Sequence, residues 1–129
     1  MTSAVLDTSA LLAMLLVEPG GVRVQKVITD ASMSTINLGE TVGLLTRQGF
    51  DLPAIRRLLD ALPFDRVLFD EDQAYAAGLL LPLTRPAGLS LGDRACLALA
   101  AKLGVPALTA DRAWSSVATA VGVDVQLIR

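Results

Sequence analysis

Short apolar runs alternate with longer amphipathic segments along the whole chain. Runs such as 4–6 and 106–109 are bounded by polar or turn-forming residues, which is typical of buried strands. Segments such as 37–48 repeat apolar residues every three or four positions and therefore predict helices. The pattern predicts strands at 4–6, 33–35, 66–69, 106–109 and 124–128, helices at 8–18, 22–30, 37–48, 51–62, 70–83 and 90–103, a loop at 84–89, and mixed helix and turn over 112–121. This alternation predicts an α/β fold, with a parallel sheet covered by helices on both faces.

The size and composition are those of a globular protein. We expect residues 1–129 to form a single domain with its own core. Hydrophobic residues make up 53% of the chain, which excludes an intrinsically disordered protein. Cys96 is the only cysteine, so no intrachain disulfide forms, and we interpret it as a small core residue. The apolar run 10–17 is too short to cross a bilayer, and no Lys or Arg precedes it, as one would in a signal peptide. We therefore expect a cytoplasmic protein without membrane contact.

The absence of histidine narrows the chemistry. It excludes Ser-His-Asp triads, Cys-His pairs and His-ligated zinc. Hydrolysis would then depend on carboxylates, whose hard oxygen atoms suit Mg²⁺ or Mn²⁺. The net charge of −2 does not favour a nucleic-acid partner. If four of the 13 acidic residues share one pocket, however, nine remain against 11 basic residues, and this balance allows a basic rim around the pocket.

Two aspartates follow short apolar strands. Asp7 comes after the run 4–6, Asp111 follows the run 106–109, and each precedes a predicted helix. In an open α/β sheet, ligands bind outside the carboxyl ends of the strands, where the strand order reverses. We expect both side chains to point there. Each residue taken alone also fits a simpler role as the N-cap of the next helix, because Asp is favoured at that position.

Two further acidic residues lie on predicted helices. Asp93 follows a serine by three residues, which is the spacing of a capping box, so it is either a cap or a ligand. Glu40 is one of three glutamates and lies one helical turn after Asn37; it is either an exposed surface residue or part of a site. Gly39 and Gly43 are four residues apart in the same helix and predict a close approach to another backbone.

One interpretation covers all four acidic residues, namely that they converge on a metal ion. Carboxylates gathered this closely repel one another and stay ionised only beside cations. A divalent ion relieves the repulsion, polarises a phosphoryl oxygen and lowers the pKa of a bound water. The four residues are Asp7, Glu40, Asp93 and Asp111.

Four stretches of the sequence carry a family resemblance. They are Val5–Leu12 (VLDTSALL), Glu40, Ser90–Ala100 (SLGDRACLALA) and Leu108–Trp114 (LTADRAW). In this order and at these intervals they resemble the PIN-domain family and, within it, the VapC toxins of bacterial toxin–antitoxin pairs. The last stretch is the least typical of the family. The resemblance implies a three-layer α/β/α sandwich around a five-stranded parallel sheet.

The resemblance also implies a Mg²⁺- or Mn²⁺-dependent endoribonuclease. The residues that match the acidic quartet of the family are Asp7, Glu40, Asp93 and Asp111. Thr109 matches a hydroxyl residue that supports the site, and we expect Ser9 to support Asp7 in the same way. Local backbone capping is the alternative for both hydroxyls. A homodimer and a cognate antitoxin protein that blocks the acidic pocket are further implications.

We expect metal-assisted hydrolysis of a phosphodiester in a structured RNA, either tRNA or rRNA. Asp7, Asp93 and Asp111 would bind the ion, and Glu40 would bind through water or orient the attacking water. The candidate phosphate contacts, for which ordinary solvated charge is the alternative, are Arg85, Arg94 and Arg112. The basic residues of the middle third, which would line an RNA path or meet an acidic partner segment, are Arg47, Arg56, Arg57 and Arg66.

Three other functions stay open at this point. The same fold and site serve a housekeeping nuclease of RNA maturation, or a PIN module that binds RNA or protein without cutting. A phosphatase or receiver that uses a strand-end Asp as phosphoacceptor is disfavoured. Such phosphatases usually carry Asp-x-Asp where this chain has Ser9, and the only lysines, Lys26 and Lys102, do not follow a late strand.

Overall fold

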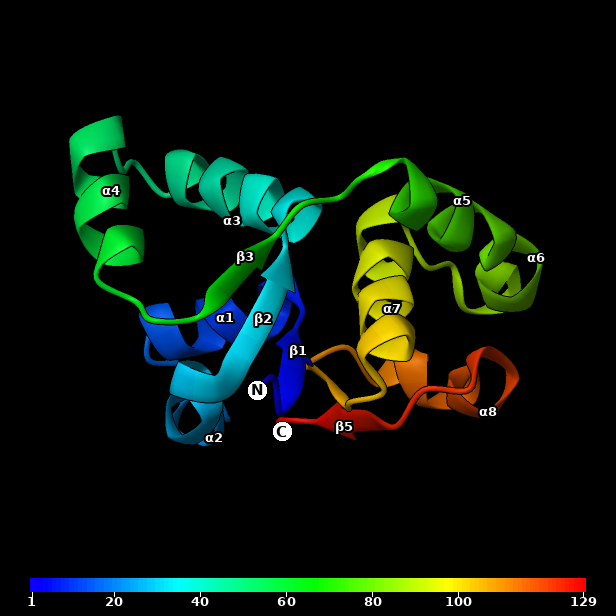
Figure 1. Ribbon diagram of the computed structural model, residues 1–129. Coiled ribbons are helices and arrows are strands. Elements are labelled where there is room, and N and C mark those ends of the chain that lie inside the picture. The colour runs from blue at the N-terminus through cyan, green and yellow to red at the C-terminus, as the bar shows by residue number, and fades with distance from the viewer.

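Figure 1 shows the computed structural model, which describes residues 1–129. Its centre is a five-stranded sheet in the order β3-β2-β1-β4-β5, and every strand pair is parallel. The strands are β1 (Ala4–Leu6), β2 (Ala31–Ser34), β3 (Asp65–Val67), β4 (Ala107–Thr109) and β5 (Val125–Leu127). The predicted α/β class and the five-stranded parallel sheet are confirmed.

Eight α-helices and three short 3₁₀ helices connect the strands. The α-helices are α1 (Thr8–Leu15), α2 (Gly21–Val27), α3 (Thr35–Arg47), α4 (Leu52–Asp60), α5 (Glu71–Leu79), α6 (Leu81–Thr84), α7 (Leu91–Leu103) and α8 (Ala118–Val121). The 3₁₀ helices are η1 (Ile28–Asp30), η2 (Arg85–Ala87) and η3 (Arg112–Ser116). No helix has the length and apolar character needed to cross a membrane.

Several predicted boundaries are wrong, among them that of the strand expected at 33–35, which runs from Ala31 to Ser34. The single helix expected at 70–83 is split at Leu80, because Pro82 lacks an N–H group and fits only the first turn of a new helix, α6. The expected loop after it contains η2. The helix expected from residue 37 begins at Thr35, since the Ser34 hydroxyl accepts a hydrogen bond from the Ile36 N–H at 3.3 Å and caps it.

Side chains of β1 alternate between two cores, one on each face of the sheet. Leu6 lies in a cluster with Leu11 of α1 and Val24 of α2. Val5 points the other way, into a cluster with Leu97 of α7 and Trp114 of η3. Successive strand residues face opposite sides of a sheet, so both faces are buried under helices. This arrangement is the predicted α/β/α sandwich.

The strand order reverses between β1 and β4. From β1 the chain adds β2 and then β3 on one side, and it returns to place β4 and β5 on the other. The connections after two neighbouring strands therefore leave the sheet in opposite directions, which opens a crevice at their carboxyl ends. Helix α3 lies along this edge, and α7 begins there (Figure 1).

Candidate active site

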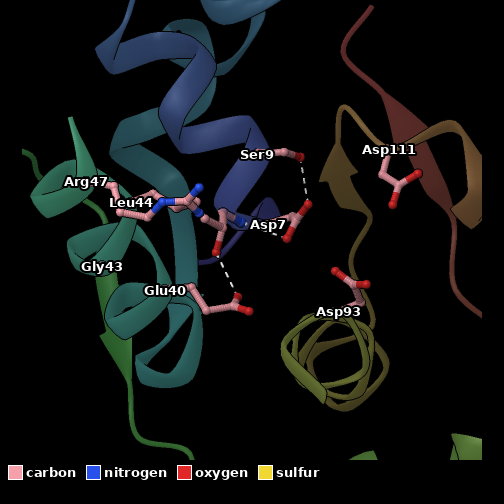
Figure 2. Close-up of a pocket in the computed structure, with 9 residues that line it drawn as sticks. Asp7, Ser9, Glu40, Gly43, Leu44, Arg47, Asp93 and Asp111 are labelled. Carbon is pink, nitrogen blue, oxygen red and sulfur yellow. Dashed lines mark hydrogen bonds between the residues drawn. The ribbon is translucent and has the colours of Figure 1, made fainter. Parts of the chain in front are cut away.

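All four predicted carboxylates line one open pocket at the carboxyl edge of β1 and β4. The pocket has a volume of about 500 Å³. Figure 2 shows the four side chains arranged around a common space, each from a different part of the chain. The lining residues are Asp7, Thr8, Ser9, Glu40, Gly43, Leu44, Arg47, Asp93 and Asp111. The convergence expected from strand ends and helix starts is therefore present.

Asp7 is held by three hydrogen bonds directly after β1. Its Oδ1 accepts from the Thr8 N–H at 2.7 Å, which caps α1. Its Oδ2 accepts from the hydroxyls of Ser9, at 2.7 Å, and Thr109, at 2.8 Å. Asp7 is only 4% exposed, so these bonds fix both the position and the rotamer of its carboxylate.

The two hydroxyls also organise the backbone after β4. The Ser9 Oγ accepts from the Ala110 N–H at 2.9 Å, and the Thr109 Oγ1 accepts from the Asp111 N–H at 3.0 Å. Each hydroxyl has one proton, and each gives it to Asp7, so the 3.2 Å contact between the two hydroxyls carries no proton of its own. Ser9 and Thr109 thus tie the residue after β1 to the segment that carries Asp111.

Glu40 is oriented from one side. Its Oε1 accepts from the Thr8 hydroxyl and from the Asn37 side-chain amide, both at 3.0 Å. The same amide donates to the Gly92 carbonyl at 3.0 Å and so joins α3 to α7. A Cβ at Gly92 would overlap the Glu40 carboxylate, so this glycine makes room for it. The Asn37 partnership was expected from its spacing, whereas Thr8 and Gly92 were not anticipated.

Asp93 belongs to the capping box of α7, and Asp111 is the N-cap of η3. The Asp93 Oδ2 accepts from the Ser90 N–H at 2.8 Å, and Asp93 N–H donates back to the Ser90 hydroxyl at 3.2 Å, which completes the capping box. The Asp111 Oδ1 accepts from the Ala113 N–H at 3.0 Å and caps η3. The capping alternative considered for each aspartate is therefore correct, and all three also line the pocket.

Burial and mutual repulsion set the acidity of the site. Burial raises the pKa of Asp7 to about 6, with a smaller contribution from the charge of Asp93, although its three hydrogen bonds lower it. Burial also raises the pKa of Asp93, and the negative charges of Glu40 and Asp111 add to this effect. Both shifts show negative charge concentrated in a partly desolvated pocket.

The donor set fits a hard divalent cation. Three carboxylate oxygens have no hydrogen-bond partner: Oε2 of Glu40, Oδ1 of Asp93 and Oδ2 of Asp111. Oxygen ligands of this kind are those that Mg²⁺ and Mn²⁺ prefer. As the side chains stand, no three of them are arranged to hold one ion. Binding would therefore draw the carboxylates together.

None of the arginines named as candidate phosphate contacts lines the pocket. Arg94 points elsewhere, because its guanidinium donates to the Ala77 carbonyl at the end of α5 at 3.0 Å. We therefore withdraw Arg94 as an RNA contact. Arg85 and Arg112 are exposed outside the pocket and stay predictions. The arginine that does line it is Arg47, which belonged to the broader set of basic residues.

Solved structures of similar fold include chains from toxin–antitoxin complexes. The DNA-bound VapBC complex of Salmonella typhimurium contains a chain with a TM-score of 0.70 and 18% identity, covering 100% of both chains. A chain of VapBC2 from Rickettsia felis, bound to a promoter DNA fragment, has a TM-score of 0.71 and 12% identity, and the match covers 98% of both chains. VapBC-5 of Mycobacterium tuberculosis, a member of the VapBC family of toxin–antitoxin systems, has a TM-score of 0.59 and 22% identity. The match covers 100% of this chain and 99% of the VapBC-5 chain.

At these identities the structural matches show a shared fold. A search of curated protein sequences gives no significant match. The family model for the PIN domain matches residues 4–120, which include every acidic residue of the pocket. This chain belongs to the PIN domain family.

Proposed function

We propose that this chain is a metal-dependent endoribonuclease that uses Mg²⁺ or Mn²⁺ to hydrolyse a phosphodiester bond in a structured RNA. The observation that carries the proposal is the convergence of four carboxylates on one pocket at the switch point of the sheet. Three of them keep an oxygen free of hydrogen bonds. A site that served only to cap helices would not need Glu40, which caps none.

Each side chain has a distinct role in this proposal. Asp7, Asp93 and Asp111 would hold the ion, which would supply charge stabilisation at the phosphoryl group and lower the pKa of the attacking water. Glu40 presents Oε2 to the pocket and accepts a proton from the attacking water. Thr8 and Asn37 fix the other oxygen of Glu40, while Ser9 and Thr109 fix Asp7. These supporting bonds keep the acidic groups in place before substrate arrives.

We further propose that the chain is the toxin of a toxin–antitoxin pair and works as a homodimer. Chains of similar fold come from complexes described as VapBC or toxin–antitoxin assemblies. Tyr75 and Leu79 of α5 are 68% and 75% exposed and border a shallow apolar hollow, which suits a surface covered by a second copy. A housekeeping nuclease would not arrest growth on expression, whereas a toxin would, and a small protein encoded beside it would relieve the arrest.

RNA cleavage by the purified protein tests the enzymatic proposal. The wild type should cut tRNA or rRNA with Mg²⁺ or Mn²⁺ and lose activity in chelator. Asp93→Asn, which keeps a side-chain oxygen that can accept from the Ser90 N–H, should lose activity as well. Cleavage that persists in chelator, or full activity in Asp7→Asn and Asp93→Asn, would refute the proposed site.

A further inference from the structure

The acidic pocket has one cationic residue in its lining. Four of the nine lining residues are acidic, and Arg47 is the only basic one. It lies in the last turn of α3 and is exposed to solvent. Figure 2 shows its side chain extending from α3 toward the space between the carboxylates. An RNA strand that enters this pocket must bring phosphate groups past four carboxylates, and a cation at this position would offset part of their repulsion.

Arg47 is not occupied as a counter-ion within the chain. The ion pairs of the structure are Arg56–Asp60 and Arg129–Glu18, and no carboxylate oxygen lies within 4.0 Å of the Arg47 guanidinium. Nor does its side chain donate a hydrogen bond, unlike Arg23, Arg66 and Arg94, which bond to main-chain carbonyls. Its five N–H donors are therefore available to a ligand.

The helix face between Glu40 and Arg47 is open. Gly43, Leu44 and Arg47 follow Glu40 by three, four and seven residues, so all four share one face of α3, and all of them line the pocket. A Cβ at Gly43 would have no neighbour within 4 Å. The close backbone approach expected at Gly39 and Gly43 is thus absent within this chain. Gly43 instead leaves an uncovered strip of helix that leads from Arg47 to the carboxylates.

We propose that Arg47 anchors a phosphate group of the RNA strand at the rim of the pocket, with the bare strip at Gly43 admitting the sugar-phosphate chain. The inference rests on the proposed ribonuclease function and adds a substrate-binding residue to it. A guanidinium binds a phosphate through paired N–H donors, an arrangement that positions the strand without reading its sequence. Arg47 touches the substrate away from the reacting bond and lowers KM, while the carboxylates set kcat.

Binding of fluorescein-labelled bulk tRNA, measured by anisotropy over a series of KCl concentrations with MgCl₂ present, tests the anchor. Arg47→Ala should weaken binding about tenfold and reduce the slope of log Kd against log salt by about one, because one phosphate contact is lost. Arg47→Lys should restore most of the slope but less of the affinity, since Lys keeps the charge without the paired donors. Lys26→Ala removes one exposed charge from α2, outside the pocket, and should match the wild type.

The glycine strip has its own matched pair of variants. Gly43→Leu covers the open strip of α3 that lines the pocket, whereas Gly39→Leu adds the same side chain to the same helix at a position that does not line it. Only Gly43→Leu should weaken tRNA binding. Equal binding and an equal salt slope for wild type and Arg47→Ala would overturn the anchor.

The two proposals fail in different ways. If tRNA binds with the expected dependence on Arg47 but neither tRNA nor rRNA is cut with either metal, the ribonuclease proposal fails and the phosphate anchor stands. If RNA is cut in a manner that requires Asp93 but Arg47→Ala keeps the wild-type KM and salt slope, the anchor fails alone.

Discussion

Three aspartates of this protein both stabilise a helix N-terminus and line the acidic pocket. Asp7 and Asp111 each cap a helix through one carboxylate oxygen, Asp93 completes the capping box of α7, and all three line the acidic pocket. The hydrogen bond from the helix N-terminus fixes the carboxylate, and the helix dipole favours its negative charge. Capping and ligand positioning are therefore two results of one geometry.

The pH dependence of stability should identify Asp7. Its folded pKa of about 6 lies above the ordinary value of 3.8, so its contribution to stability is fully present below about pH 3.8 and is lost as the pH rises through about 6. In metal-free protein at neutral pH, Asp7→Asn should raise the free energy of unfolding by roughly 3 kcal/mol, because Asn resembles the protonated form of Asp7. Urea denaturation in chelator checks this.

The advantage of Asp7→Asn should shrink as the pH falls below 6, because wild-type Asp7 is then protonated in the folded chain. An advantage that is constant with pH would contradict the assignment of the raised pKa to Asp7. Asp51→Asn, which alters an exposed N-cap aspartate at α4, is the control and should show no such trend.

Gly92→Ala should displace Glu40 without unfolding the protein. The new Cβ overlaps the Glu40 carboxylate, so that flexible side chain must leave its bonds to Thr8 and Asn37. We expect cleavage to fall about 100-fold, which is the scale of a misplaced general base, with a stability change within about 1 kcal/mol. Single-turnover cleavage and thermal unfolding measure the two effects.

The control for this variant is Gly39→Ala in α3, an exposed helix position outside the pocket where a Cβ meets no neighbour. It should leave cleavage unchanged. Wild-type cleavage by Gly92→Ala would show that the position of Glu40 does not matter.

At the scale of elements, α3 organises one wall of the site. A single face of the helix carries Asn37, Glu40, Gly43 and Arg47, from the buried contact with α7 to the exposed rim. The opposite side buries Thr41 and Leu45. Its two glycines lie in solvent without a packing partner, so they weaken the helix for no gain inside this chain.

Replacing these glycines by alanine should therefore stabilise the protein. Gly39→Ala and Gly43→Ala should each raise the free energy of unfolding by about 0.5–1 kcal/mol, because Ala has the higher helix propensity. Urea denaturation of the two variants measures the gain. A loss of stability that grows with protein concentration would mean that a second copy packs against this face.

The sequence predicted this site unevenly, and the reasons are physical. Asp7 and Asp111 were predictable because a short apolar run fixes where a strand ends and which edge its last side chain faces. The hydrogen bonds from Arg94 to Ala77 and from Asn37 to Gly92 could not be predicted from the sequence. Each depends on how α7 rotates against α5 or α3, and that rotation is set by packing between segments far apart in the chain. Periodicity identifies a buried face but not the neighbour that it meets.

At the scale of the whole molecule, the sheet brings together residues separated by more than a hundred positions. Asp7 and Thr109 bond across β1 and β4, next to the switch point. A cation bound there would bridge segments that the chain connects only through the rest of the fold. Metal binding should therefore stabilise the fold as a unit, as expected for any ligand that binds only the folded state.

Thermal unfolding with and without MgCl₂ or MnCl₂ measures this coupling. Either ion should raise the Tm of the wild type, and the increase should disappear in Asp93→Asn and Asp7→Asn. Lys102→Ala, at the far end of α7 from Asp93, should keep the full increase. A metal-induced rise in Tm that survives both aspartate variants would place the ion elsewhere.

The double duty of the three aspartates has a consequence for how the protein can evolve. A descendant that no longer needed its chemistry would still be selected to keep a capping side chain (Asp, Asn, Ser or Thr) at positions 7 and 111, because losing a helix cap costs about 1 kcal/mol. Glu40 caps nothing and is exposed to solvent, so drift can remove it without that penalty. Among relatives of this chain, the residue at position 40 should therefore separate working enzymes from inactive descendants better than the presence of a capping side chain at positions 7 and 111 does.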